Sequence, residues 1–212
     1  MSTSFGAPVV VSKAGDDLAY PLVVLLHGRG SDEKEIIGLA NYLPVGPSYV
    51  ALRAPIAEGD GYAWFANRGV GRPVSESLRD TMAWFYSWLE SVAEPSRKVM
   101  LVGFSGGAAF AGGLILANPN RFAAAAILYG TLPFDAGLKV APGQLAGLPV
   151  YLAHGDQDRV IPRELLRRTW QYLTSEAGAV TTAIHGPGGH ELSPEALSKL
   201  DEWIAQLLEQ EV

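Results

Sequence analysis

Short runs of apolar and often β-branched residues alternate along the chain with longer stretches in which apolar residues recur at helical spacing. The short runs predict strands, at residues 8–11, 21–26, 49–54, 98–104, 123–130, 149–155 and 179–186. The longer stretches predict helices at 32–43, from Ser75 or Ser77 to before Pro95, from the glycines after Ser105 to about Asn118, after Pro162, and at 192–210. The alternation predicts an α/β fold, a doubly wound and mostly parallel sheet with helices on both faces.

No linker, internal repeat or low-complexity tract divides the 212 residues, so we expect one domain spanning residues 1–212. Two long stretches, 55–74 and 130–148, fit neither the strand pattern nor the helix pattern. Long irregular connections within one domain often carry function. These two stretches are therefore the candidate site loops.

Composition excludes several classes of function. The formal net charge of −6 argues against nucleic acid as a partner. The chain has no cysteine, which excludes disulfides, thiol nucleophiles and thiolate zinc sites. The N-terminal segment does not resemble a signal peptide, and the apolar runs are far shorter than the roughly 20 residues of a membrane-spanning helix. We therefore expect no membrane span and a cytoplasmic location.

A serine stands where one predicted strand ends, in the run Gly103-Phe104-Ser105-Gly106-Gly107. This run fits the G-x-S-x-G pattern of a nucleophile elbow, a sharp strand-to-helix turn that exposes a serine hydroxyl at the top of a sheet. Glycines suit the turn because the incoming strand and the outgoing helix pass close to each other. The helix N-terminus adds free N–H groups that stabilise a negatively charged oxygen. The competing interpretation is a glycine-rich turn in which Ser105 is an ordinary N-cap.

A nucleophilic serine needs a histidine base and an acid that orients the histidine, and both are expected later in the chain. His190, in the glycine-rich loop GPGGHELS, is preferred to His185, which ends a predicted strand. Two acids follow a strand end in the segment HGDQD. Asp158 lies further out than Asp156 and is preferred, although position alone leaves both open.

The oxyanion that forms when an ester is attacked needs two N–H donors. One is expected from Gly106, directly after the serine, and the other from Arg29 in the loop HGRG, which follows the strand at 21–26. Only the backbone of Arg29 is required for this role. His27, in the same loop, is expected to organise the loop rather than to act as the base, because it precedes the serine.

Four segments together resemble the carboxylesterase/phospholipase family of α/β-hydrolases, which includes the acyl-protein thioesterases: the elbow, HGRG, HGDQDRVIP and GGHELSPEAL. The resemblance implies an α/β-hydrolase fold without a large lid. It implies a serine carboxylesterase that acts on small-molecule esters of short to medium chain, lysophospholipids and thioesters included, without a cofactor or a metal. It implies Ser105, Asp158 and His190 as the catalytic triad, and it allows a homodimer.

The segment APIAEGDGYAWF resembles the family's loop that ends in Trp-Phe, which implies that Trp64 and Phe65 wall the acyl pocket, with Tyr62 nearby. Burial in the core is the alternative for these aromatic residues. Two departures from the family pattern are evident. Gly106 stands where the family commonly has glutamine, which predicts a roomier pocket, and ANRGVGRP follows Trp-Phe where Asp is common, so the family's substrate choice does not transfer.

Two other functions compete with the esterase. A catalytically silent binding protein could use the same fold, because a fold alone does not guarantee chemistry. A metal-dependent hydrolase could use His154, Asp156 and Asp158, completed by His27 or His190. The metal hypothesis is weaker because no H-E-x-x-H motif is present and the elbow would be left without a role. Four arginines near the expected pocket mouth are interpreted as surface charge rather than as a site for an anionic substrate: Arg29, Arg53, Arg68 and Arg72.

Overall fold

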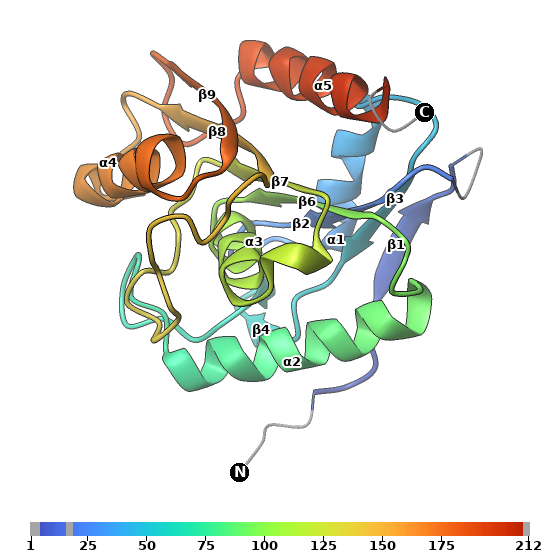
Figure 1. The fold of residues 1–212 in the computed structure, drawn as a ribbon. Coiled ribbons are helices and arrows are strands. Elements are labelled where there is room, and N and C mark those ends of the chain that lie inside the picture. Colours follow the sequence, from blue (N-terminus) through green and yellow to red (C-terminus); the bar gives the residue numbers. More distant parts are fainter. Residues whose placement is uncertain (1–4, 16–18, 210–212) are drawn as a thin grey trace.

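A seven-stranded sheet runs through the computed structural model, which describes residues 5–15 and 19–209 (Figure 1). The strand order is β1-β3-β2-β6-β7-β8-β9. β1 is antiparallel to β3, and every other neighbouring pair in the sheet is parallel. The strands are β1 (Val10–Lys13), β2 (Leu22–Leu26), β3 (Ser48–Leu52), β6 (Val99–Phe104), β7 (Ala124–Leu128), β8 (Pro149–Gly155) and β9 (Val180–Gly186).

Helices cover both faces of this sheet, with α2 and α3 on one side and α1 and α5 on the other (Figure 1). The strands supply alternate residues to the two sides: Val24 belongs to the core cluster with α2 and α3, and Val23 and Leu25 belong to the cluster with α5. Both faces of the central strands are therefore dry, which explains their unbroken apolar sequences. The helices are α1 (Glu33–Ile36), α2 (Ser75–Val92), α3 (Gly106–Ala117), α4 (Arg163–Gln171) and α5 (Pro194–Glu209).

The predicted α/β architecture is confirmed, and the differences from the prediction lie mainly at element ends. β1 begins two residues later than the predicted strand at 8–11, and the predicted helix at 32–43 is only the short α1 followed by a 3-10 turn over Ile37–Asn41. The last residue of the predicted helix at 192–210 lies outside the described residues. Val92, at the end of α2, is 46% exposed, whereas Leu89 and Ala93 on either side of it are buried in the core.

One element in the stretch 55–74 was not predicted. A two-stranded antiparallel hairpin forms there from β4 (Ile56–Glu58) and β5 (Gly61–Ala63). Gly59 has a φ of +59°, a conformation that suits glycine in the tight turn of such a hairpin. The dipeptide Gly59-Asp60 between two short apolar segments is the sequence signal that could have revealed it.

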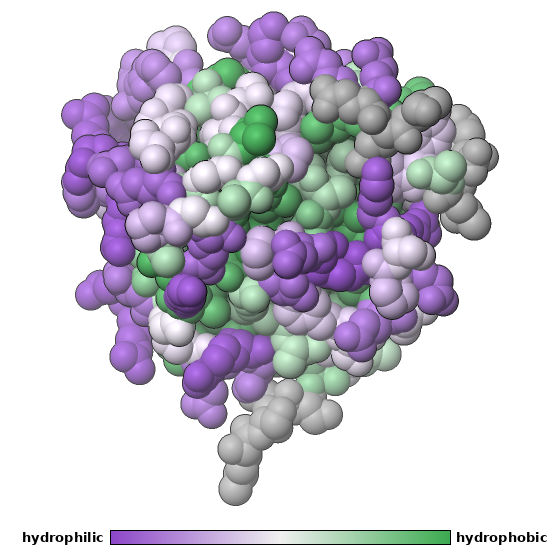
Figure 2. Space-filling view, viewed as in Figure 1, coloured by the Kyte–Doolittle hydropathy of each residue, from purple (hydrophilic) through white to green (hydrophobic). Residues whose placement is uncertain are grey.

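The surface in Figure 2 carries hydrophobic side chains in the middle of the face shown, with hydrophilic side chains around them. Within the described residues, no helix combines the length and the apolar character that crossing a bilayer requires.

Candidate active site

Ser105 lies on a sharp turn between β6 and α3 and has an unusual backbone conformation. Its φ is +54° and its ψ is −113°, and its N–H donates to the Leu128 carbonyl oxygen of the neighbouring strand at 2.9 Å. A Cβ added to Gly107 would lie 2.1 Å from the Leu26 carbonyl oxygen, so the turn of α3 after the serine passes too close to β2 for any side chain. A strained conformation of this kind persists where the surroundings enforce it, and the glycines are what allow it here.

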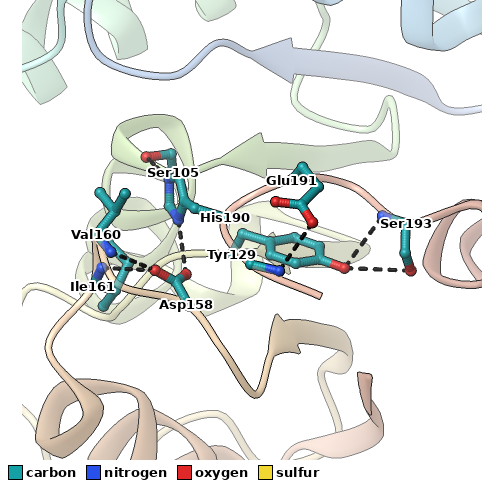
Figure 3. Close-up of polar contacts among 9 residues, drawn as sticks. Ser105, Tyr129, Asp158, Val160, Ile161, His190, Glu191 and Ser193 are labelled. Atoms are coloured by element: carbon teal, nitrogen blue, oxygen red, sulfur yellow. Dashed lines mark hydrogen bonds and ion pairs between the residues drawn. The ribbon is translucent and has the colours of Figure 1, made fainter. Parts of the chain in front are cut away.

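The structure brings Ser105, His190 and Asp158 into one chain of hydrogen bonds (Figure 3). The Nε2 atom of His190 lies 2.8 Å from the Ser105 Oγ, and the Nδ1 atom lies 2.7 Å from the Asp158 Oδ2. The Asp158 side chain is fully buried, and its other oxygen accepts the N–H groups of Val160 and Ile161 at 2.8 and 2.9 Å. These two bonds fix the carboxylate, so the imidazole is held in one orientation against the serine.

His185 and Asp156 form a separate pair. The His185 Nδ1 lies 2.9 Å from the Asp156 Oδ1, and both side chains are about half exposed. His154 stacks on His185 rather than joining the serine or Asp158. Asp156 and Asp158 thus belong to two different pairs, and His154 and His27 to neither. No group of three or more potential ligands that could hold a metal occurs within residues 5–15 and 19–209. The geometry therefore gives the metal hypothesis no support.

The backbone N–H groups of Arg29 and Gly106 lie beside the serine and are available to a ligand. A Cβ added to Gly106 would be 3.2 Å from the Arg29 nitrogen, so the two backbones run close together. Neither N–H has an acceptor among the described residues, and both residues line the same cavity as Ser105. Gly106 is also the first residue of α3, where the helix dipole favours negative charge.

The β4–β5 hairpin holds the HGRG loop in place. The Gly30 N–H donates to the Tyr62 carbonyl oxygen at 2.9 Å, and the Tyr62 N–H donates to the Ser31 carbonyl oxygen at 3.0 Å. The guanidinium of Arg29 reaches the Phe65 carbonyl oxygen at 3.0 Å and forms an ion pair with Glu58. The Arg29 side chain thus fastens the same loop whose backbone N–H faces the cavity.

His27 is buried beneath this loop as a neutral imidazole. Its Nδ1 lies 2.7 Å from the Gly28 carbonyl oxygen, and its Nε2 accepts the Ala54 N–H at 3.0 Å, which places the ring proton on Nδ1. Burial lowers the pKa of His27 and so favours the neutral form. The prediction that His27 organises the loop agrees with these contacts.

Phe65 lines a cavity of about 640 Å³ that also contains Ser105 and His190, whereas Trp64 and Tyr62 do not line it. Trp64 is 1% exposed, stacks on Phe110, and donates its indole N–H to the His27 carbonyl oxygen. Trp64 and Phe65 are neighbours in a bend after β5 and both are buried, but only Phe65 reaches the cavity. The Tyr62 ring instead lies under the Arg53 guanidinium, whose Cζ is 4.6 Å from the centroid of the ring. Of the three residues predicted to wall the pocket, the structure places Phe65 in the cavity wall and Tyr62 and Trp64 outside it.

Most of the remaining cavity wall is apolar and comes from the two irregular stretches and from the segment after Asp158. Apart from Phe65, these apolar wall residues are not indicated by the sequence pattern; they include Val70 and Pro73 in the first stretch, Pro133 in the second, and Val160 and Ile161 after Asp158. Asn67 and Thr131 add amide and hydroxyl groups. A cavity with apolar walls and a few polar groups is typical of small-molecule sites.

The model of the Phospholipase/Carboxylesterase family matches residues 6–208. The chain belongs to this family. It is 22% identical to the putative hydrolase MhqD of Bacillus subtilis (strain 168), over 88% of this chain and 94% of the relative. It is 24% identical to acyl-protein thioesterase 1 of Eremothecium gossypii, over 97% of this chain and 95% of the relative.

Solved structures agree with the family's fold. The carboxylesterase of Bacillus cereus superimposes with a TM-score of 0.84 at 24% identity and covers 94% of both chains. At this identity the likeness establishes the fold alone. The resemblance to carboxylesterases noted in the sequence is therefore confirmed at the level of family and fold.

Proposed function

We propose that this protein is a serine carboxylesterase that hydrolyses small-molecule esters through an acyl-enzyme intermediate. The observation that carries the proposal is the chain of hydrogen bonds from Ser105 through His190 to the buried Asp158, at 2.8 and 2.7 Å. Membership of the phospholipase/carboxylesterase family adds independent support.

In the proposed reaction the Ser105 Oγ attacks the ester carbonyl carbon while its proton passes to the Nε2 of His190. The carbonyl oxygen becomes an oxyanion and accepts the N–H groups of Arg29 and Gly106. His190 then returns the proton to the departing alcohol, and the acyl group stays on Ser105. A water molecule repeats the sequence on the acyl-enzyme, which releases the acid and restores the serine. Asp158 keeps its charge and stabilises the imidazolium at each proton transfer.

The apolar wall supports an acyl group of short to medium length as the substrate portion in the cavity. Phe65, Pro133 and Ile161 contribute hydrophobic surface, and the cavity volume of about 640 Å³ fits a small molecule. Gly106, where the family commonly has glutamine, leaves this side of the cavity without a side chain.

Hydrolysis of a p-nitrophenyl ester series from acetate to dodecanoate tests the proposal and the pocket depth together. We expect activity with the shorter chains and a decline as the acyl chain outgrows the cavity. Ser105→Ala should lower kcat by about 10⁴-fold or more at unchanged thermal stability. If purified protein hydrolyses no member of the series, the esterase proposal fails and a silent binding protein of the same fold becomes the better account. If Ser105→Ala retains the activity, the proposed mechanism with Ser105 as the nucleophile fails.

A further inference from the structure

Tyr129, directly after β7, has a backbone conformation that a large side chain rarely adopts. Its φ is +50°, and it shares a positive φ only with Ser105 among the non-glycine residues that the structure describes. The residue is 3% exposed, and its N–H donates to the Ala153 carbonyl oxygen at 2.8 Å. A bulky residue in the left-handed region is strained, and such strain persists where the surrounding structure enforces it, commonly at functional sites. Packing a tyrosine ring in a core does not require it.

The phenol hydroxyl of Tyr129 reaches the segment that carries His190 (Figure 3). It accepts the Ser193 N–H at 3.3 Å and donates to the Ser193 Oγ at 3.4 Å. Ser193 directly precedes α5 and caps its N-terminus, since its Oγ accepts the Ala196 N–H at 3.1 Å. The hydroxyl therefore connects the end of β7 to the point where the His190 loop enters a helix, three residues after the imidazole.

A second path leads from Tyr129 to the same imidazole through Phe104. The ring centroids of Tyr129 and Phe104 are 6.0 Å apart, and those of Phe104 and His190 are 5.4 Å apart. Within the loop itself, the Glu191 carboxylate accepts the Gly189 N–H at 2.9 Å. His190 is thus held by Asp158 at Nδ1, by the Phe104 ring alongside, and by the anchored segment after it.

We propose that Tyr129 is a positioning residue for His190. Its hydroxyl fixes the segment 190–193 against the end of β7 and so keeps the imidazole Nε2 within hydrogen-bond reach of the Ser105 Oγ. Tyr129 touches neither the serine nor the cavity, so it acts through His190. The catalytic part of this inference rests on the proposed esterase function, whereas the anchoring part does not.

Tyr129→Phe removes the hydroxyl and keeps the ring. Tyr151→Phe is the matched control, because the hydroxyl of the buried Tyr151 also bonds to the first turn of α5, where it donates to the Ala196 carbonyl oxygen at 2.8 Å. That bond lies beyond Ser193 and does not fix the His190 loop. A role in stability alone predicts the same behaviour from both variants.

With p-nitrophenyl acetate we expect Tyr129→Phe to lower kcat by about tenfold, the equivalent of one lost hydrogen bond at the catalytic geometry, with KM unchanged. The rate of inactivation by a fluorophosphonate should fall in parallel, because it depends on the same base. Tyr151→Phe should keep wild-type kcat even where its melting temperature falls. A wild-type kcat in Tyr129→Phe, or equal losses of kcat in both variants, would overturn the proposal.

Hydrogen exchange in the absence of substrate separates this inference from the proposed function. We expect the Ser193 amide and the loop at 186–193 to exchange faster in Tyr129→Phe than in wild type, and to be unaffected in Tyr151→Phe. If wild type hydrolyses no ester yet exchange rises as expected, the esterase proposal fails and the anchor stands. If esters are hydrolysed and exchange of the loop is the same in all three proteins, the anchor is refuted and the esterase proposal stands.

Discussion

Gly61 lies in the β4–β5 hairpin and is not a catalytic residue, yet adding a single methyl group there should lower the catalytic rate. A Cβ at this position would lie 2.0 Å from the Gly30 carbonyl oxygen and 2.3 Å from its carbonyl carbon. Real Cβ atoms do not approach other atoms closer than 3.0 Å, so the hairpin and the HGRG loop must separate by about 1 Å. The Arg29 N–H, one residue before Gly30, would be displaced with the loop.

A misplacement of about 1 Å in a catalytic group can cost about 10²-fold in rate, and removing one oxyanion donor costs about 10² to 10³-fold. We therefore expect Gly61→Ala to lower kcat for p-nitrophenyl acetate by about 10²-fold, with KM nearly unchanged. Overpacking should also lower the free energy of unfolding by about 1 to 3 kcal/mol, which thermal unfolding would measure.

Gly38→Ala is the control for this experiment, because a Cβ on Gly38 would meet no atom within 4 Å. It should keep wild-type kcat. If Gly61→Ala folds and also keeps wild-type kcat, the hairpin does not position the oxyanion donor, and the role assigned to the Arg29 N–H would have to be withdrawn.

Three further predictions follow from the same contacts. Asp158→Asn should lower kcat by about 10⁴-fold while Asp156→Asn stays near wild type, as measured with p-nitrophenyl acetate, and the opposite ranking would exchange their roles. Glu33→Gln should lower the free energy of unfolding at pH 7 by about 2 kcal/mol, because it breaks the ion pair between the buried Glu33 carboxylate and the partly exposed Arg53 guanidinium. Arg53 lowers the pKa of Glu33, so the difference from wild type should shrink below about pH 4.5, where the ordinary carboxyl is protonated; equal stability of the two proteins at pH 7 would contradict this. Burial lowers the pKa of His27, so the unfolded chain binds a proton at this residue more readily than the folded protein does, and the free energy of unfolding falls as the pH drops below about 6.5. Denaturant titrations at pH 7 and pH 5 should therefore show a smaller loss of that free energy in His27→Asn than in wild type. An equal loss in both proteins would refute this.

The sheet and its helices could be predicted from the sequence because strands buried on both faces must be apolar throughout. The hairpin could not be predicted as easily, because each of its strands has only three residues and neither is long enough to show alternation. This short hairpin is important for the proposed site, since it supports the loop that carries Arg29. The single domain, the cytoplasmic location and the homodimer stay predictions.

The pocket shows where sequence reasoning reached its limit. Trp64 and Phe65 are adjacent, aromatic and both buried, and only the path of the backbone decides that Phe65 also reaches the cavity. The same holds for Asp156 and Asp158. Both follow β8, and the turn between them sends Asp158 to His190 and Asp156 to a different histidine. The order of serine, acid and histidine could be read from the chain, but these pairings depend on loop geometry.

Intact-mass analysis of the protein after treatment with a fluorophosphonate tests the central claim most directly. We expect one adduct per chain, located on Ser105 by peptide mapping, absent in Ser105→Ala and formed far more slowly in His190→Ala. Modification of a different residue, or an unmodified Ser105 in wild-type protein, would contradict the assignment of this serine as an activated nucleophile.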